Sequence, residues 1–241
     1  MIPKVIHYCW FSGEKKPRLI RRCIRSWKKV LPDYEIKCWD ANSFDFESVP
    51  YVKQAYERKK WAFVADYVRL YALYTEGGIY LDSDVEVYKS FDEFLKYSFF
   101  TGTDVNDKRD IYAIEPAIMG AENGLLYLKE CLDYYKQLQF VKSDGSMDLK
   151  VMPYIISPLL EKYGYRSIDK TQYLSHNIVV FSSAYFANRN VLNYSNLYAR
   201  HWNAASWANI ECRGKIFHFF YRCNLMYFYK VIEKLFIRLR S

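Results

Sequence analysis

Apolar and polar residues follow two different periods along the first part of the chain. Residues 4–11 form a short apolar and aromatic run that ends at Ser12 and Gly13, as expected for a first β-strand. From Pro17 to Val30 the apolar residues recur with helical spacing, and residues 35–39 alternate as a second strand. This β-α-β opening predicts an α/β fold with a parallel sheet covered by helices.

The clearest predicted helix spans residues 61–76, and Gly77 and Gly78 end it. A single strand rich in β-branched and apolar residues is predicted over 79–87. Beyond it the pattern predicts strands near 97–102 and 112–119, a helix at 124–139 and an exposed loop at 140–150. We expect one domain over residues 1–215 and a C-terminal extension over 216–241.

Basic residues gather towards the two ends of the chain, which carries a net charge of +8. Residues 15–29 contain eight basic residues and no acidic one, and 213–241 contain seven basic residues and one acidic residue. This asymmetry indicates a polyanionic partner or an anionic membrane surface. The helical spacing of apolar residues after Tyr227 fits a helix lying in a membrane interface and, equally, a helix packed on the domain.

The composition excludes several classes of protein. With 51% apolar residues, 9 Gly and 7 Pro, the chain is neither disordered nor collagen-like. No stretch of about 18 residues is both free of charge and predominantly apolar, so we expect no membrane-spanning helix. The six cysteines form no CxxC pair and the N-terminus lacks the features of a signal peptide. We therefore expect reduced, buried thiols in a cytoplasmic protein.

Two carboxylates, Asp82 and Asp84, stand at the end of the predicted strand 79–87. Side chains two apart on a strand point to one face, where like charges repel each other. A pair of hard oxygen ligands suits Mg²⁺ or Mn²⁺, which would also bind phosphate. An exposed turn that carries two acids by chance fits the same short motif.

Asp66 and Arg69 lie three residues apart on the helix that precedes this motif, and therefore on one side of it. Their neighbours are apolar almost all round, which is typical of a buried helix. A surface ion pair of little consequence is the alternative interpretation. A buried ion pair is costly to keep without a use, so this pair points to a functional site.

Three segments resemble the family 32 glycosyltransferases, which include capsular and cell-surface polysaccharide transferases and are related to the glucosylating toxins. The segments are IPKVIHYCWFSG at 2–13, WAFVADYVRLYALYTEGGIYLDSDVEV at 61–87 and RHWNAASW at 200–207. The resemblance implies a GT-A fold, a nucleotide-sugar donor, a divalent metal ion and retention of anomeric configuration.

The resemblance also implies roles for single residues. Asp82, Asp84 and His201 would hold the metal ion, with Asp82 also contacting ribose, and the histidine would favour Mn²⁺ over Mg²⁺. Contacts with the nucleotide sugar are implied for Trp10, Asn42, Asp66, Arg69, Tyr80, Asp82, Ser206 and Trp207. Catalysis would depend on Asp82, Asp84 and Arg69. Where some relatives carry Ser before the helix Asp, this chain has Ala65.

Retaining transfer needs a carboxylate nucleophile or attack on the face from which the leaving group departs. Glu115 and Asp107 are both candidates for such a nucleophile, and a same-face reaction needs neither. The His201 assignment competes with a purely structural histidine, and Trp207 with a buried anchor.

The predicted function is transfer of a hexose from UDP-galactose or another UDP-hexose to a lipid-linked oligosaccharide, in capsular or surface polysaccharide synthesis. We expect this at the inner face of the cell membrane, with an anionic membrane surface as a partner and no nucleic acid. The alternatives are a GDP-mannose-dependent mannosyltransferase and a basic membrane- or nucleic-acid-binding module without catalysis. The haloacid-dehalogenase phosphatases also have a DxD motif, but they carry Thr or Val at the position that Glu86 occupies in this chain.

Overall fold

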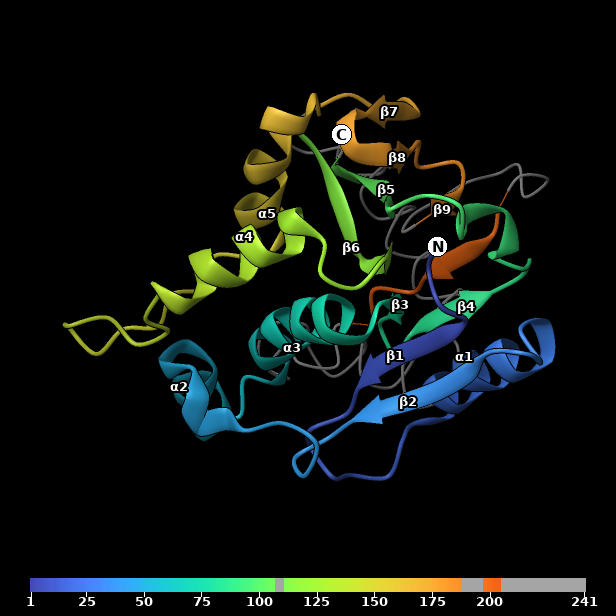
Figure 1. Ribbon diagram of the computed structural model, residues 1–241. Helices are drawn as coiled ribbons and strands as arrows, with labels where there is room; N and C mark the ends of the chain where they lie inside the picture. Colours follow the sequence, from blue (N-terminus) through green and yellow to red (C-terminus); the bar gives the residue numbers. More distant parts are fainter. Residues whose placement is uncertain (107–110, 188–196, 205–241) are drawn as a thin grey trace, which may run out of the picture.

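The computed structural model describes residues 1–106, 111–187 and 197–204. Its centre is a seven-stranded sheet in the order β2-β1-β3-β6-β5-β8-β7, which runs from bottom to top in Figure 1. The strands are β1 Val5–Cys9, β2 Glu35–Trp39, β3 Gly78–Leu81, β5 Phe99–Asn106, β6 Ile111–Ala121, β7 Gln172–Leu174 and β8 Ile178–Phe181. β1 pairs in parallel with β2 and β3, and β5 in parallel with β8, whereas β6 runs antiparallel to both of its neighbours, so the predicted parallel pairing holds for only part of the sheet.

A second, three-stranded sheet has the order β4-β10-β9. It consists of β4 Val85–Val87, β9 Phe186–Ala187 and β10 Ala199–His201. β10 runs antiparallel to β4, so that His201 lies opposite Val85. This pairing joins the segment after β3 to a segment near the end of the described chain.

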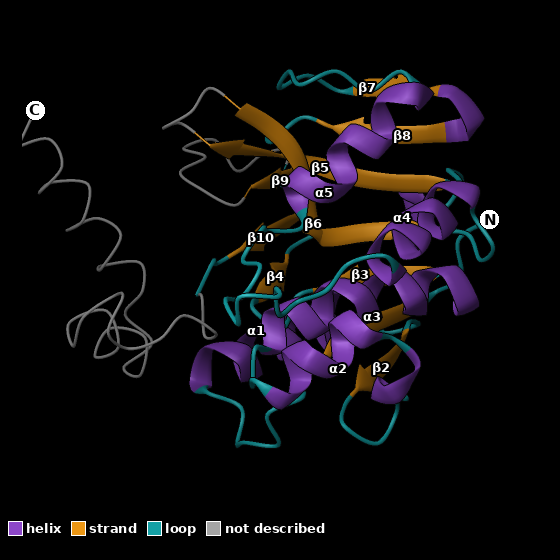
Figure 2. Ribbon diagram, turned by 90° about the vertical axis from the view of Figure 1, so that its left-hand side faces the viewer, coloured by secondary structure: helices purple, strands orange, loops and turns teal. Residues whose placement is uncertain are grey.

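The two faces of the large sheet are covered differently. The helices are α1 Arg18–Val30, α2 Pro50–Glu57, α3 Trp61–Glu76, α4 Leu126–Lys136 and α5 Pro153–Leu160. Helices α2 to α5 cover one face, in front of the strands in Figure 2, and share one apolar core with it. On the other face, Trp27 of α1 packs in a second core with residues of β4, β9 and β10. The layers therefore alternate as helices, sheet, and a mixed layer of α1 with the small sheet.

The first predicted elements are confirmed. β1, β2 and α3 appear within the predicted ranges, and α1 buries the face that carries Leu19, Ile20, Cys23 and Trp27. Cys38 is only half-buried, so the expectation of buried thiols is wrong at that position. The extension at 216–241 lies outside the described residues, and its boundary stays a prediction.

Two features differ from the predicted elements. The single strand expected over 79–87 is wrong, because the chain leaves the large sheet after Leu81 and turns at Asp82–Asp84, where the Val85 N–H donates to the Asp82 carbonyl at 2.9 Å. β3 and β4 therefore belong to different sheets. Helix α2 was not predicted, although Pro50 stands at its first turn, where proline is favoured.

Gly78 links α3 to β3 and is the subject of a stability prediction. Its φ is +103°, and a Cβ there would lie 2.7 Å from the Val5 carbonyl oxygen. Gly164 has the same φ of +103° with no atom within 4 Å of such a Cβ. We therefore expect Gly78→Ala to lower the free energy of unfolding by about 1–3 kcal/mol more than Gly164→Ala, as measured in urea. Equal losses would contradict the close approach of Val5.

Candidate active site

A cavity of about 590 Å³ opens where β1 and β3 end. These strands are parallel, so their carboxyl ends meet at one edge of the sheet, where ligands bind in open α/β sheets. The cavity is bordered by residues that follow β1 and β3, by one side of α3, by β6, and by the segment after β10. Segments far apart in the sequence thus converge on one space.

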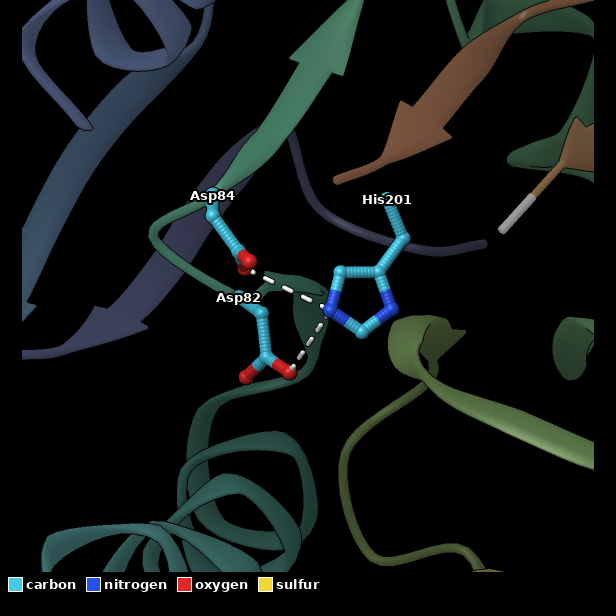
Figure 3. Close-up of side chains that lie close together, drawn as sticks. All are labelled: Asp82, Asp84 and His201. Atoms are coloured by element: carbon cyan, nitrogen blue, oxygen red, sulfur yellow. Dashed lines mark ion pairs between the residues drawn. The ribbon is translucent and has the colours of Figure 1, made fainter. Parts of the chain in front are cut away.

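Asp82, Asp84 and His201 lie together at this cavity, as Figure 3 shows. The Nε2 atom of His201 is 3.4 Å from Oδ1 of Asp84 and 3.8 Å from Oδ2 of Asp82. One ligand atom from each of the three residues lies within 4.8 Å of the others. The three side chains could therefore approach a single ion.

The backbone holds this cluster in place from several directions. The Asp82 N–H donates to the Ala117 carbonyl of β6 at 2.9 Å, and the turn that follows brings Asp84 back towards the cavity. The Trp202 N–H donates to the Asp84 carbonyl at 3.1 Å, and the Ala204 N–H donates to the Asp84 carboxylate at 2.7 Å. The segment carrying His201 is therefore bonded directly to the residue that it faces.

The charges of the cluster call for a cation. Burial alone would lower the pKa of His201, but the carboxylates of Asp84 and Glu115 raise it well above its ordinary value. Burial likewise opposes the charged form of Asp84, yet His201 and the Ala204 N–H lower its pKa. The buried acids thus favour a positive charge beside them, which a bound divalent ion would supply.

The donor set fits a divalent metal ion. Two carboxylates and one imidazole are ligands suited to Mn²⁺, which accepts oxygen readily and nitrogen more readily than Mg²⁺ does. Asp82, Asp84 and His201 would hold the ion, as the sequence analysis expected. The identity of the ion stays a prediction.

Arg69 lines the cavity and is only 4% exposed. Its Nη1 donates to the Pro116 carbonyl at 2.8 Å, and its Nη2 lies 3.0 Å from Asp66 Oδ1 and 3.4 Å from Asp82 Oδ1. Burial would lower the pKa of Arg69, but Asp82, Tyr80 and Asp66 raise it above its ordinary value. Arg69 therefore holds two acids of the site in addition to any ligand that it binds.

Asp66 and Tyr80 complete this part of the site. Asp66 is 8% exposed, and burial raises its pKa to about 7 although Arg69 opposes the shift. The Tyr80 hydroxyl donates to Asp82 Oδ1 at 2.9 Å, and the Arg69 guanidinium lies 4.7 Å from the centre of its ring. The buried ion pair expected on this helix is present.

The structure brings most of the predicted site residues together. Trp10 borders the cavity directly after β1, and its ring nitrogen donates to the Glu14 carbonyl at 2.8 Å. Asn42 is exposed and is not among the residues that line the cavity. Ser206, Trp207 and Asp107 lie outside the described residues. The roles assigned to all of these residues stay predictions.

Trp61 and Asp104 are among the residues that line the cavity and were not predicted. Trp61 stands at the first position of α3, and Asp104 lies on β5 opposite Ala113. An acid within a strand is disfavoured, which was a usable signal for Asp104. Trp61 opens the segment 61–87, but the pattern does not distinguish it from a core residue.

Part of this chain is similar to known glycosyltransferases. Residues 17–101 match the family described as "Glycosyltransferase sugar-binding region containing DXD motif". An uncharacterised glycosyltransferase of Acanthamoeba polyphaga mimivirus is 32% identical over 108 residues, which cover 42% of each chain. The inositol phosphoceramide mannosyltransferase 3 of Schizosaccharomyces pombe is 34% identical over 103 residues, which cover 40% of this chain and 28% of that protein. The matched part thus spans less than half of each relative.

Solved structures of glycosyltransferases also show structural similarity to this chain. One is a PaToxG glycosyltransferase, at 18% identity over 67% of this chain and 69% of that chain, with a TM-score of 0.48. Another is a glycosyltransferase involved in the glycosylation of the major capsid of PBCV-1, at 12% identity over 89% of this chain and 98% of that chain, with a TM-score of 0.49.

The matched region contains Asp66, Arg69, Asp82 and Asp84, which the structure places around one cavity. The predicted resemblance is confirmed for this region, and the α/β architecture expected for a GT-A-type domain is present. Residues 17–101 are therefore similar to the glycosyltransferase sugar-binding regions that contain a DXD motif.

Proposed function

We propose that this chain is a metal-dependent, retaining glycosyltransferase that uses UDP-galactose or another UDP-hexose as its preferred donor. The observation that carries the proposal is the convergence of Asp82, Asp84 and His201 on a cavity that Arg69 and Trp10 also border. An ion held by these three residues would supply Lewis-acid stabilisation of the charge that develops on the leaving diphosphate.

The positions of Trp10, Asp66 and Arg69 suggest contacts with the base, the sugar and the diphosphate of the donor. Trp10 offers an aromatic face to the nucleotide base, since stacking of this kind tolerates different bases. Asp66 would accept hydrogen bonds from sugar hydroxyls, with Arg69 holding it in place at 3.0 Å. Arg69 also brings a fixed positive charge to the side of the cavity where a diphosphate would lie.

The acceptor is proposed to be a lipid-linked oligosaccharide in capsular or surface polysaccharide synthesis. GDP-mannose is the second candidate donor, because the fission-yeast relative is named as a mannosyltransferase. Discrimination between two hexoses depends on single hydroxyl contacts with the sugar.

A panel of nucleotide sugars, each incubated with and without Mn²⁺, tests the function. We expect slow, Mn²⁺-dependent release of UDP from one UDP-hexose, measured by a coupled nucleotide assay. Release from GDP-mannose alone would replace the preferred donor and leave the reaction class in place. Absence of both nucleotide release and calorimetric binding of UDP or GDP with Mn²⁺ would contradict the proposal.

We also propose peripheral association with the inner face of the cell membrane. No helix in the described part of the chain is both long and apolar enough to cross a bilayer. The outward side of α1 carries exposed Arg21, Arg25, Lys28 and Lys29. An anionic lipid surface attracts such a cluster. Residues 216–241, predicted as a membrane contact with residues 15–29 as the second one, lie outside the described residues.

Sedimentation with lipid vesicles checks this association. The double variant Arg21→Gln/Arg25→Gln is expected to bind anionic vesicles more weakly, by about fivefold for each charge removed. Deleting residues 226–241 should weaken binding further. The matched control is Lys136→Gln/Lys142→Gln, which removes two charges from a different part of the surface. Equal binding by both double variants, or equal binding to neutral vesicles, would refute the membrane contact.

A further inference from the structure

Strand β6 is interrupted by a bulge directly beside the candidate active site. Thr101 of β5 lies opposite Met119, but the next residue, Gly102, lies opposite Glu115. Residues 116–118 of β6 therefore have no partner in β5. Bulges of this kind redirect side chains and are common next to active sites.

The bulge is bonded to the site through its backbone. The Pro116 carbonyl accepts the Nη1 donor of Arg69 at 2.8 Å, and the Ala117 carbonyl accepts the Asp82 N–H at 2.9 Å. The Thr101 hydroxyl lies 2.9 Å from the carbonyl oxygens of both Glu115 and Ile118, and so closes the bulge from the opposite strand. The position of Glu115 is therefore tied to that of Arg69 and Asp82.

The side chain of Glu115 is turned towards His201. Glu115 is 3% exposed, and its Oε1 accepts the Ala117 N–H at 3.2 Å. The same oxygen lies 3.3 Å from the Nδ1 atom of His201, whose other nitrogen faces Asp82 and Asp84. Nδ1 is buried and has no well-aligned hydrogen bond to any described residue. Glu115 thus stands on the side of the imidazole away from the two aspartates.

We propose that Glu115 is the positioning residue for His201, and that it is not the nucleophile of the transfer reaction. A histidine that binds a metal ion through Nε2 carries its proton on Nδ1, and a carboxylate beside Nδ1 fixes that tautomer and the orientation of the ring. Glu115 borders the cavity, but its Oε1 is already directed at the Ala117 N–H and the imidazole. This inference rests on the metal site proposed above.

Binding of Mn²⁺ alone, without any nucleotide sugar, separates the two roles. Loss of an outer partner of a metal-bound histidine weakens metal affinity by about 10- to 100-fold. We expect Glu115→Ala to lose affinity by about this factor, as measured by paramagnetic resonance of free Mn²⁺. Glu115→Gln keeps an oxygen that can accept the Nδ1 proton, so it should retain more affinity than Glu115→Ala. A nucleophile would leave Mn²⁺ affinity unchanged in both variants.

Glu130→Ala is the control, because Glu130 is a partly buried acid that pairs with Lys162 outside the cavity. Thermal unfolding without metal identifies any variant that fails to fold. If Glu115→Ala does not fold, Glu115→Gln decides: a Kd several-fold weaker than that of the unchanged chain supports the positioning role. A Kd within twofold for the folded Glu115 variants, with binding lost in Asp84→Asn, would overturn the inference and leave the metal site in place. Failure of the unchanged chain to bind Mn²⁺ would overturn both.

Discussion

Replacing Asp84 by asparagine is expected to remove both Mn²⁺ binding and metal-dependent nucleotide release. Asparagine keeps an oxygen that can accept the Ala204 N–H, which donates to the Asp84 carboxylate at 2.7 Å. It removes the negative charge that faces His201 at 3.4 Å. Because changes in outer partners alone cost up to about 100-fold in metal affinity, loss of a direct ligand should cost at least about that much. Mn²⁺ titration and the nucleotide-release assay measure the two effects.

Asp144→Asn is the matched control for this variant. Asp144 lies in the exposed loop between α4 and α5 and bonds only locally, to Ser146, in the contacts described for it. It removes the same charge away from the cavity, so Mn²⁺ affinity and nucleotide release should stay as in the unchanged chain. An Asp84→Asn protein that binds Mn²⁺ normally would show that the Asp82–Asp84 pair is not the metal site.

Replacing Arg69 by methionine is expected to destabilise the fold strongly. The change leaves Asp66, Asp82 and the Pro116 carbonyl without their shared donor. Removing one partner of a buried ion pair costs about 3–5 kcal/mol. For a domain of this size, that corresponds to a fall in Tm of roughly 6–20 °C, which calorimetry can measure. The Tm of Arg69→Lys should lie between those of Arg69→Met and the unchanged chain, because lysine keeps the charge but cannot form the two parallel hydrogen bonds of a guanidinium group.

The loss of stability caused by Arg69→Met should also depend on pH. Burial already raises the pKa of Asp66 to about 7, and Arg69 is the group that opposes this shift. Without Arg69 the folded-state pKa of Asp66 rises further, while its unfolded value stays near 3.8. The folded variant therefore holds a proton that the unfolded chain releases, and its stability falls as pH rises. We expect the Tm difference from the unchanged chain to widen between pH 6 and pH 8.

Arg25→Met on the exposed side of α1 provides the comparison. It removes the same side chain from a surface position, where substitutions have little effect on stability. A Tm for Arg69→Met as high as that of Arg25→Met would show that the buried pair contributes little. A Tm difference that narrows with rising pH would contradict the part assigned to Asp66.

The elements that local periodicity controls could be predicted from the sequence. The apolar surround of α3 indicated a buried helix, and Gly77 and Gly78 ended it where the structure does. The strand over 79–87 was wrong because its apolar and β-branched residues continue past the point where the sheet ends. The strand ends at the turn of Asp82–Asp84, after which β4 pairs with β10, and no local pattern reports this long-range pairing.

Some residues of the site could likewise be placed from local spacing, whereas others depend on long-range pairing. Asp66 and Arg69 could be placed on one side of a helix from their spacing alone. His201 was predicted as a metal ligand only from the family resemblance. Its position depends on the pairing of β10 with β4, which the local sequence does not indicate. The place of Glu115 beside His201 follows from a bulge in β6 that the alternation of residues does not reveal. Long-range pairing therefore limits what the sequence alone could predict here.

The pairing of β4 with β10 sets the order in which the site can be assembled. A chain synthesised from its N-terminus contains both aspartates long before residue 201 is added, and β10 must then close a loop of over a hundred residues against β4. The entropy cost of closing a loop rises only slowly with its length, so the large separation is tolerated. The imidazole of His201 thus reaches the two aspartates through a pairing of strands that lie far apart in the sequence. The complete set of ligands exists only after β10 has paired with β4.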